Sequence, residues 1–250
     1  MSREVIMKRF LLSILLLSTS LFLQAEETEK APCEPPKEEA IDTRVVRLNF
    51  LDEVVFKVPG CVIIKQGTVN EYRIVGNEAS LREIKVSASA GDLTVQPKGL
   101  QIGLKNIGPI TLYVTAKNLQ QLKLKGDANC NLKGISTQKL IIETHGNAKV
   151  KGDLILQELV INIHGNAHFN LKGTAQKQSI AMHGNATFNA SKLASNSVEI
   201  DIHGNGKAML KVSQKLIVSI SGNGSVSYIG NPKTLKHTIR GKGSLRRVSR

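Results

Sequence analysis

A short phrase centred on glycine returns seven times between residues 125 and 242 of this 250-residue chain. The glycines are 20, 19, 19, 20, 18 and 19 residues apart. The copies are Lys125-Gly126-Asp127, His145-Gly146-Asn147, His164-Gly165-Asn166, His183-Gly184-Asn185, His203-Gly204-Asn205, Ser221-Gly222-Asn223 and Arg240-Gly241-Lys242. A constant period near 19 predicts a solenoid, in which each repeat buries its apolar face only against its neighbours.

Apolar and polar residues alternate on both sides of each glycine, as β-strands with one buried face require. The copy around Gly165 has its apolar positions at Leu159, Ile161, Ile163, Ala167, Phe169 and Leu171. The Gly-Asn pair between the two runs predicts a corner, because both residues tolerate positive φ. A meander of hairpins is the competing all-β arrangement, but a corner of constant phase favours coils.

We therefore predict an all-β fold, a right-handed parallel β-helix of about seven ~19-residue coils. Residues of equal phase would stack in columns at the inter-strand spacing of ~4.8 Å. The coils occupy residues 119–250, and the short strands expected in residues 43–118 form a β-rich leader that caps one end. Together they make a single domain, 43–250.

The remaining segments precede this domain. Residues 1–25 have a basic start, an apolar run and a plausible cleavage site, so they are predicted to be a signal peptide, with a retained anchor as the alternative. Residues 26–42 are acidic and contain proline, which is typical of a flexible linker. No later apolar stretch reaches the ~18 residues of a membrane-spanning helix. The expected location is the periplasm or the cell surface.

The charge is distributed unevenly. The chain carries +14 overall, with +2 in residues 1–25 and −5 in residues 26–42, which leaves +17 for residues 43–250. A basic domain predicts attraction to anionic polymers of the envelope, such as lipopolysaccharide. Alternatively, the lysines only solvate a β-surface and discourage aggregation. Aromatic residues make up only 4% and tryptophan is absent, which argues against a function based on stacking, whether on sugars or on single-stranded nucleic acid. Specific nucleic-acid recognition is therefore not expected.

The three cysteines leave at least one thiol unpaired. Cys130 occupies an inward position of its repeat, where Val150 and Phe169 stand in later copies, so a buried thiol is predicted there. Cys33 and Cys61 are then the candidate pair, and the sequence leaves open whether they form a disulfide.

Three stretches carry a resemblance to a known family. They are Phe50–Gly67, Asp92–Val95 and the closing segment Ser221–Pro232. Together they resemble the head GIN domain of the family named "putative auto-transporter adhesin", over about residues 44–249. The resemblance implies a β-helix, a cell-envelope location and no assigned activity. The family usually repeats Ser-Gly-Ser-Gly at its corners, whereas most corners here begin His-Gly-Asn, so no site residues can be transferred.

Four histidines share one outward repeat position and should form a column, with Lys125 at one end and Arg240 at the other. The candidate ligand-binding residues are Lys125, His145, His164, His183, His203 and Arg240. Three interpretations stay open: a structural ladder of stacked imidazoles, a pH-sensitive anion-binding strip, and capture of a transition metal by His145, His164, His183 or His203 with Glu143 or Asp201. The spacing gives no closed tetrahedral set, so no metal or cofactor is expected. The corner asparagines are expected to have a local backbone role.

The favoured function is that of a non-catalytic exported envelope protein, an adhesion, binding or structural module whose basic surface contacts anionic polymers. The alternative is an enzyme that acts on acidic polysaccharide, by analogy with other β-helices. Glu143 and Asp201 lie three coils apart, roughly 14 Å by the strand spacing, which is too far for a two-carboxylate hydrolase. The sequence leaves the oligomeric state open.

Overall fold

The computed structural model describes Cys33, residues 41–99 and residues 108–249. These residues belong to one compact unit, Pro32–Arg250. The predicted signal peptide and most of the predicted acidic linker lie outside the described residues. Within the described ranges, no helix is long and apolar enough to cross a membrane.

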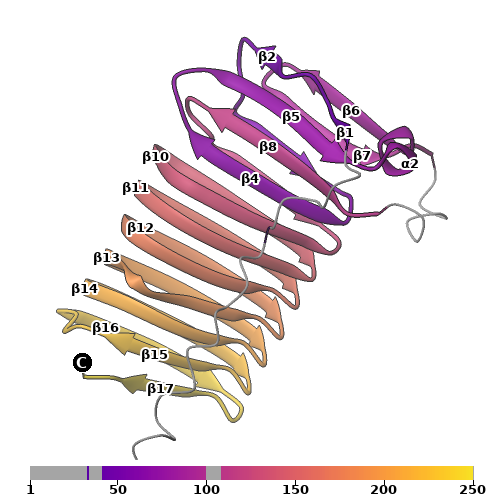
Figure 1. The fold of residues 1–250 in the computed structure, drawn as a ribbon. Helices are drawn as coiled ribbons and strands as arrows, with labels where there is room; N and C mark the ends of the chain where they lie inside the picture. The colour runs from indigo at the N-terminus through magenta and orange to yellow at the C-terminus, as the bar shows by residue number, and fades with distance from the viewer. Residues whose placement is uncertain (1–32, 34–40, 100–107, 250) are drawn as a thin grey trace, which may run out of the picture. The chain divides into compact units, whose positions relative to one another are not determined.

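The unit is built almost entirely from strands (Figure 1). The N-terminal part contains β1 (Ile41–Asp42), β2 (Val46–Leu48), β3 (Glu53–Phe56), β4 (Gly60–Gln66), β5 (Asn70–Gly76), α2 (Glu78–Arg82), β6 (Ile84–Ser89), β7 (Asp92–Pro97) and β8 (Ile110–Ala116). The repeats contain β9 (Gln121–Lys125), β10 (Ala128–Gly146), β11 (Ala148–Gly165), β12 (His168–Gly184), β13 (Thr187–Gly204), β14 (Lys207–Gly222), β15 (Ser225–Ile229), β16 (Thr234–Arg240) and β17 (Ser244–Arg247).

The long strands β10 to β14 each run through one coil and pair in parallel with the next. Their corner glycines Gly146, Gly165, Gly184 and Gly204 align one above another, and each has positive φ. The strands therefore form coils that stack one on the next along the solenoid, as Figure 1 shows. This register confirms the parallel β-solenoid and excludes a meander of hairpins, in which alternate strands would run in opposite directions.

The apolar positions of the repeats face inward. Leu140, Ile161, Ile180 and Ile202 have at most 2% of their surface exposed. Small residues such as Ala148 and Ala167 fill the narrow space beside each corner, and larger ones pack further along the strand. The rings of Phe169 and Phe188, for example, lie 5.8 Å apart on neighbouring coils. The core is therefore one continuous column of side chains that runs through all the coils.

The leader continues the solenoid, but its strands do not stack in sequence order. β3 pairs in parallel with β7 on one side and with β9 on the other. β4 likewise pairs in parallel with β8 on one side and with β10 on the other. The coil formed by residues 53–66 thus lies between the repeats and a coil that comes later in the chain, β7 with β8.

Antiparallel strands cover the outer coil of the leader. β5 pairs antiparallel with β8, and β6 pairs antiparallel with β7. β1 and β2 then add to β5 in antiparallel fashion. The sequence pattern did not predict the short helix α2. Its N-cap is Asn77, whose side-chain oxygen accepts a hydrogen bond from the Ser80 backbone N–H at 2.7 Å.

The structure answers the question about the cysteines that the sequence left open. Cys33 and Cys61 form a disulfide, with their Cα atoms 5.6 Å apart. The disulfide attaches Cys33 to β4. Cys130 is a free, fully buried thiol, and burial raises its pKa far above the ordinary value, so its reactive thiolate form is suppressed.

Candidate functional site

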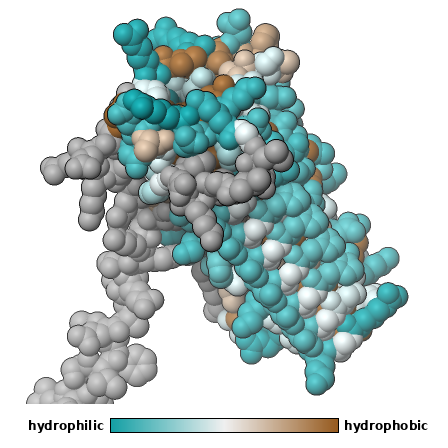
Figure 2. Space-filling view, turned by 90° about the vertical axis from the view of Figure 1, so that its right-hand side faces the viewer, coloured by the Kyte–Doolittle hydropathy of each residue, from teal (hydrophilic) through white to brown (hydrophobic). Residues whose placement is uncertain are grey.

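The structure brings all six predicted ligand-binding residues into one column. Successive strand pairings place Lys125 opposite His145, then His145 opposite His164, and so on through His183 and His203. Ser221 follows His203, and Arg240 follows Ser221. Figure 2 shows hydrophilic side chains in regular rows over the side of the solenoid that lies at the right in Figure 1. The predicted alignment of the six residues is therefore correct.

The four imidazole rings are stacked face to face. Centroids of neighbouring rings are 4.8 Å apart for His145 and His164, and 5.0 Å apart for the next two pairs. The planes of neighbouring rings differ by only 6° to 9°. At the end of the column, His203 Nε2 lies 3.3 Å from Asp201 Oδ2. The ring faces cover one another, so only the ring edges remain for contact with a ligand. A ligand-binding role for this column stays a prediction.

The corner asparagines form a second ladder, between coils. The Nδ2 atom of each donates a hydrogen bond to the Oδ1 atom of the residue one coil earlier, over distances of 2.8 to 3.3 Å. The series runs through Asn223, Asn205, Asn185, Asn166 and Asn147 and ends on the carboxylate of Asp127. The role expected from the sequence was local, whereas these amides link neighbouring coils.

Replacing Asn166 with alanine should lower stability, because it removes the bonds to both Asn147 and Asn185. These bonds are exposed, so we expect a loss of about 1 kcal/mol and a fall in Tm of about 2–4 °C for a domain of this size. The fall in Tm is measured by thermal unfolding monitored by circular dichroism. Asn170→Ala is the matched control, since Asn170 is an exposed asparagine of the next coil segment outside the ladder. Equal melting of both variants would contradict a stabilising ladder.

A different outer surface carries a concentration of lysines, and we call it the lysine face: Lys133, Lys151, Lys172 and Lys192. These residues surround a shallow cavity of about 370 Å³ that Asn131, Asp153 and Asn170 also line. The strand pairings Asp153–Lys172 and Lys172–Lys192 place one column of the face in register across three coils.

The described lining of the lysine face contains more lysines than carboxylates. Asp153 is the one acidic residue among the described residues that line the cavity, and its Oδ2 atom lies 3.2 Å from the Lys172 ammonium. In the sequence these lysines were recognised only as part of the net charge. The repeat positions of Lys133, Lys151 and Lys172, an odd number of residues after their corner glycines, would have placed these three on one face. Lys192 joins them only through the register shift between Asn170 and Lys172, which the repeat period does not show.

The described residues give little support for a catalytic or metal centre. Glu143 and Asp201 lie in the same column, three coils apart, as the pairings through Asn162 and Ala181 show. No group of three or more His, Cys, Asp or Glu side chains in the described ranges is arranged to hold a metal ion.

Sequence and fold comparisons agree with this architecture. Residues 51–232 match the family described as "Putative auto-transporter adhesin, head GIN domain". A crystal structure of a putative adhesin from Bacteroides fragilis is 22% identical with a TM-score of 0.73, covering 86% of this chain and 99% of that one. A putative lipid binding protein from Parabacteroides distasonis is 19% identical with a TM-score of 0.64, covering 85% and 98%. At these identities the structural likeness shows the fold alone. None of the curated proteins matches the chain.

Proposed function

Because the chain belongs to the head GIN domain family, we propose that it is a non-catalytic, exported cell-envelope module that binds anionic polymers through its lysine face. The observation that carries this proposal is the set of four lysines from successive coils around one cavity. A repeating polyanion that lies along the solenoid axis meets a new positive charge at successive coils. Such binding gains from release of counterions and weakens as salt is added.

The lysine face is a better candidate than the histidine column. Stacked imidazoles cover each other's faces at 4.8 to 5.0 Å, and only Lys125 and Arg240 add permanent positive charge to that column, at its two ends. The lysine face instead carries permanent charge on adjacent coils. An enzymatic role is less well supported, since Glu143 and Asp201 lie three coils apart. Glu53 does lie opposite Asp92 on a neighbouring strand, but Glu53 forms an ion pair with Lys123 at 2.8 Å.

The test is a titration of the purified protein with heparin and, separately, with lipopolysaccharide at two salt concentrations. We expect the double variant Lys172→Gln/Lys192→Gln to bind about tenfold more weakly, which corresponds to about 1.4 kcal/mol. Its salt dependence should also be shallower, because fewer ionic contacts are made.

The matched control is Lys177→Gln/Lys215→Gln. It removes the same charge from exposed positions on β12 and β14, two coils apart, and neither residue lines the cavity. The control should bind as the wild-type protein does. Equal weakening of both double variants would mean that net charge alone attracts the polymer, and binding that ignores salt would contradict the ionic mechanism.

A further inference from the structure

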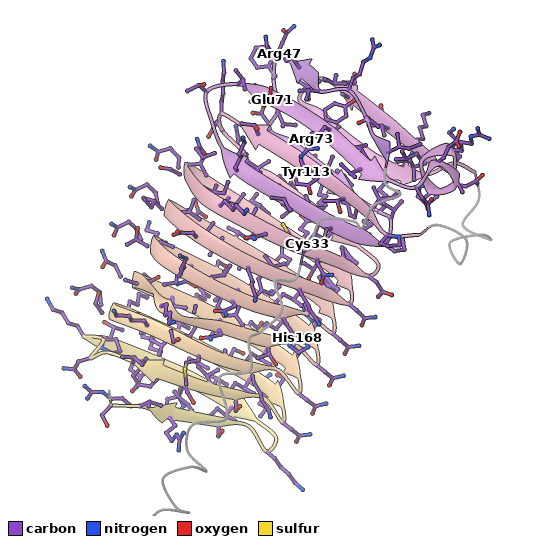
Figure 3. The ribbon with its side chains drawn as sticks, viewed as in Figure 1. Cys33, Arg47, Glu71, Arg73, Tyr113 and His168 are labelled. Atoms are coloured by element: carbon purple, nitrogen blue, oxygen red, sulfur yellow. A yellow bond between two sulfur atoms is a disulfide. The ribbon has the colours of Figure 1, made fainter. Side chains whose placement is uncertain are left out.

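A second hollow opens on the same outer surface, at the junction of the leader and the repeats. Its volume is about 250 Å³, and we call it the Tyr113 pocket. Residues that line it and carry the argument are Ile63, Lys65, Arg73, Tyr113, Thr115 and Lys133. Figure 3 shows Arg73 and Tyr113 next to each other on the face that also carries His168 further down the coils.

The pocket exists only because of the non-sequential stacking of the leader. Strand pairing places Arg73 of β5 opposite Tyr113 of β8, and Tyr113 opposite Ile63 of β4. A neighbouring column runs from Thr115 through Lys65 to Lys133 at the start of β10. The consecutive strands β4 and β5 thus combine with the later strands β8 and β10 to present two columns side by side. One contains the apolar side chains of Tyr113 and Ile63 with Arg73 at its end, and the other is polar.

The column of Arg73, Tyr113 and Ile63 forms one wall of the pocket. The Arg73 guanidinium carbon lies 4.1 Å from the centroid of the Tyr113 ring, a favourable cation–π contact that holds both side chains in place. Ile63 continues this wall on the next strand. Because Arg73 covers one face of the Tyr113 ring, the remaining ring surface and the aliphatic side chain of Ile63 are what the pocket offers to the C–H groups of a ring-shaped ligand.

The polar column presents two adjacent positive charges. Lys65 and Lys133 lie directly opposite each other on neighbouring strands, and within the described ranges neither forms an ion pair. Three other lysines of the solenoid do have acidic partners on a neighbouring strand, in the pairs Lys123–Glu53, Lys139–Glu158 and Lys172–Asp153. Like charges placed directly opposite are destabilising, so an anion bound between Lys65 and Lys133 would relieve the repulsion.

One carboxylate also borders the pocket. Glu71 Oε1 accepts a hydrogen bond from the Thr115 hydroxyl at 3.3 Å, and strand pairing places Glu71 opposite Arg47 on its other side. Lys65 and Lys133 therefore supply positive charge at one end of the pocket, and Thr115, Glu71 and the Arg73 guanidinium supply hydrogen-bonding groups at the other. This division fits a ligand with an acid group at one edge of a hydroxylated ring.

We propose that the Tyr113 pocket binds one uronic acid residue of an anionic polysaccharide. The sugar ring packs on Tyr113 and Ile63, its carboxylate lies between Lys65 and Lys133, and its hydroxyl groups meet Thr115 and Glu71. The volume falls just below the roughly 300 Å³ at which pockets for drug-sized ligands begin, so it suits a single ring. This inference rests on the proposed function, because it assumes that the bound polymer is anionic.

The pocket and the lysine face are joined. Lys133 lines both cavities, so a chain that leaves the Tyr113 pocket passes directly onto the lysine face. The lysine face supplies ionic attraction to any polyanion, while the Tyr113 pocket selects one sugar residue of the polymer by its shape. The structure thus separates affinity for charge from recognition of the acidic sugar.

The test uses oligogalacturonate of three residues, measured by isothermal titration calorimetry on the full chain. We expect Lys65→Gln and Tyr113→Ala each to weaken binding at least tenfold, while Tyr113→Phe, which keeps the ring, and Lys177→Gln bind as wild type does. The methyl-esterified trimer, which lacks the charge, should bind at least tenfold more weakly than the acid. Melting curves verify that each variant is folded, and Lys65→Gln, an exposed change, keeps the test valid if Tyr113→Ala unfolds.

The outcomes separate this inference from the proposed function. If the trimer binds Lys65→Gln and Tyr113→Ala as it binds wild type, while Lys172→Gln/Lys192→Gln weakens heparin binding, the pocket proposal is wrong and the lysine face stands. If neither heparin nor the trimer binds, both proposals fail. Phosphatidylglycerol vesicles that displace the trimer, combined with tighter binding of the vesicles, would assign the pocket to a lipid headgroup and overturn the sugar proposal.

Discussion

Replacing Gly165 with alanine is expected to lower the free energy of unfolding by about 3–5 kcal/mol. The backbone there has φ of +118°, and a Cβ atom would lie 2.6 Å from the carbonyl oxygen of Gly146 on the preceding coil. Backbone strain alone costs about 1–3 kcal/mol. The clash is with backbone, so it can be relieved only by moving one coil away from the next, which disrupts hydrogen bonds along both.

Gly126 provides the control, because it is the first glycine of the same series. Its φ is +88°, but a Cβ atom there would meet nothing within 4 Å. Gly126→Ala should therefore carry only the strain of the left-handed backbone, about 1–2 kcal/mol. Urea unfolding gives both values from the midpoint, provided that the m-value is unchanged. Equal losses in the two variants would show that the coils are not packed corner upon corner.

The sequence was sufficient to predict the coils, because two independent signals agree there. The glycine period sets the length of a coil, and the alternation around Gly165 sets which side chains face inward. Each repeat contacts only its neighbours, so local pattern and final structure are closely connected. The histidine column followed from the same reasoning, since equal phase becomes equal position once the corners align.

The order of the leader coils could not be predicted, because it depends on pairing between distant segments. β3 and β4 appear in the sequence as ordinary short strands, and nothing local indicates that they lie between β7–β8 and the repeats. A short strand can pair with many other strands, so its actual partners are determined by the packing of the whole fold. The helix α2 was missed for a related reason: at five residues it is too short to have an amphipathic period.

The candidate sites were predicted less completely than the fold. Low aromatic content argued against stacking on sugars, yet a single tyrosine, Tyr113, gains an ordered position from Arg73 of an antiparallel neighbour. The asparagine ladder was missed because the sequence shows that Asn147 and Asn166 recur, but not that their amides face each other. In both cases the decisive information is which residue lies opposite on the next strand.

The register of the coils is the claim on which the surfaces depend, and engineered cysteines test it directly. His164 and His183 are directly paired on neighbouring coils. Parallel strands lie about 4.8 Å apart, within the Cα separation that a disulfide spans. Cys33 and Cys61 are already bonded and Cys130 is buried, so the native cysteines do not interfere.

The measurement is the extent of disulfide formation after mild oxidation of the folded protein. His164→Cys/His183→Cys should close almost completely. His145→Cys/His183→Cys should stay reduced, because it spans two coils, about 10 Å at the same spacing. Free thiols counted after rapid quenching give the result. Closure of the second pair as readily as the first, or of neither pair, would contradict the in-register stack and every surface built on it.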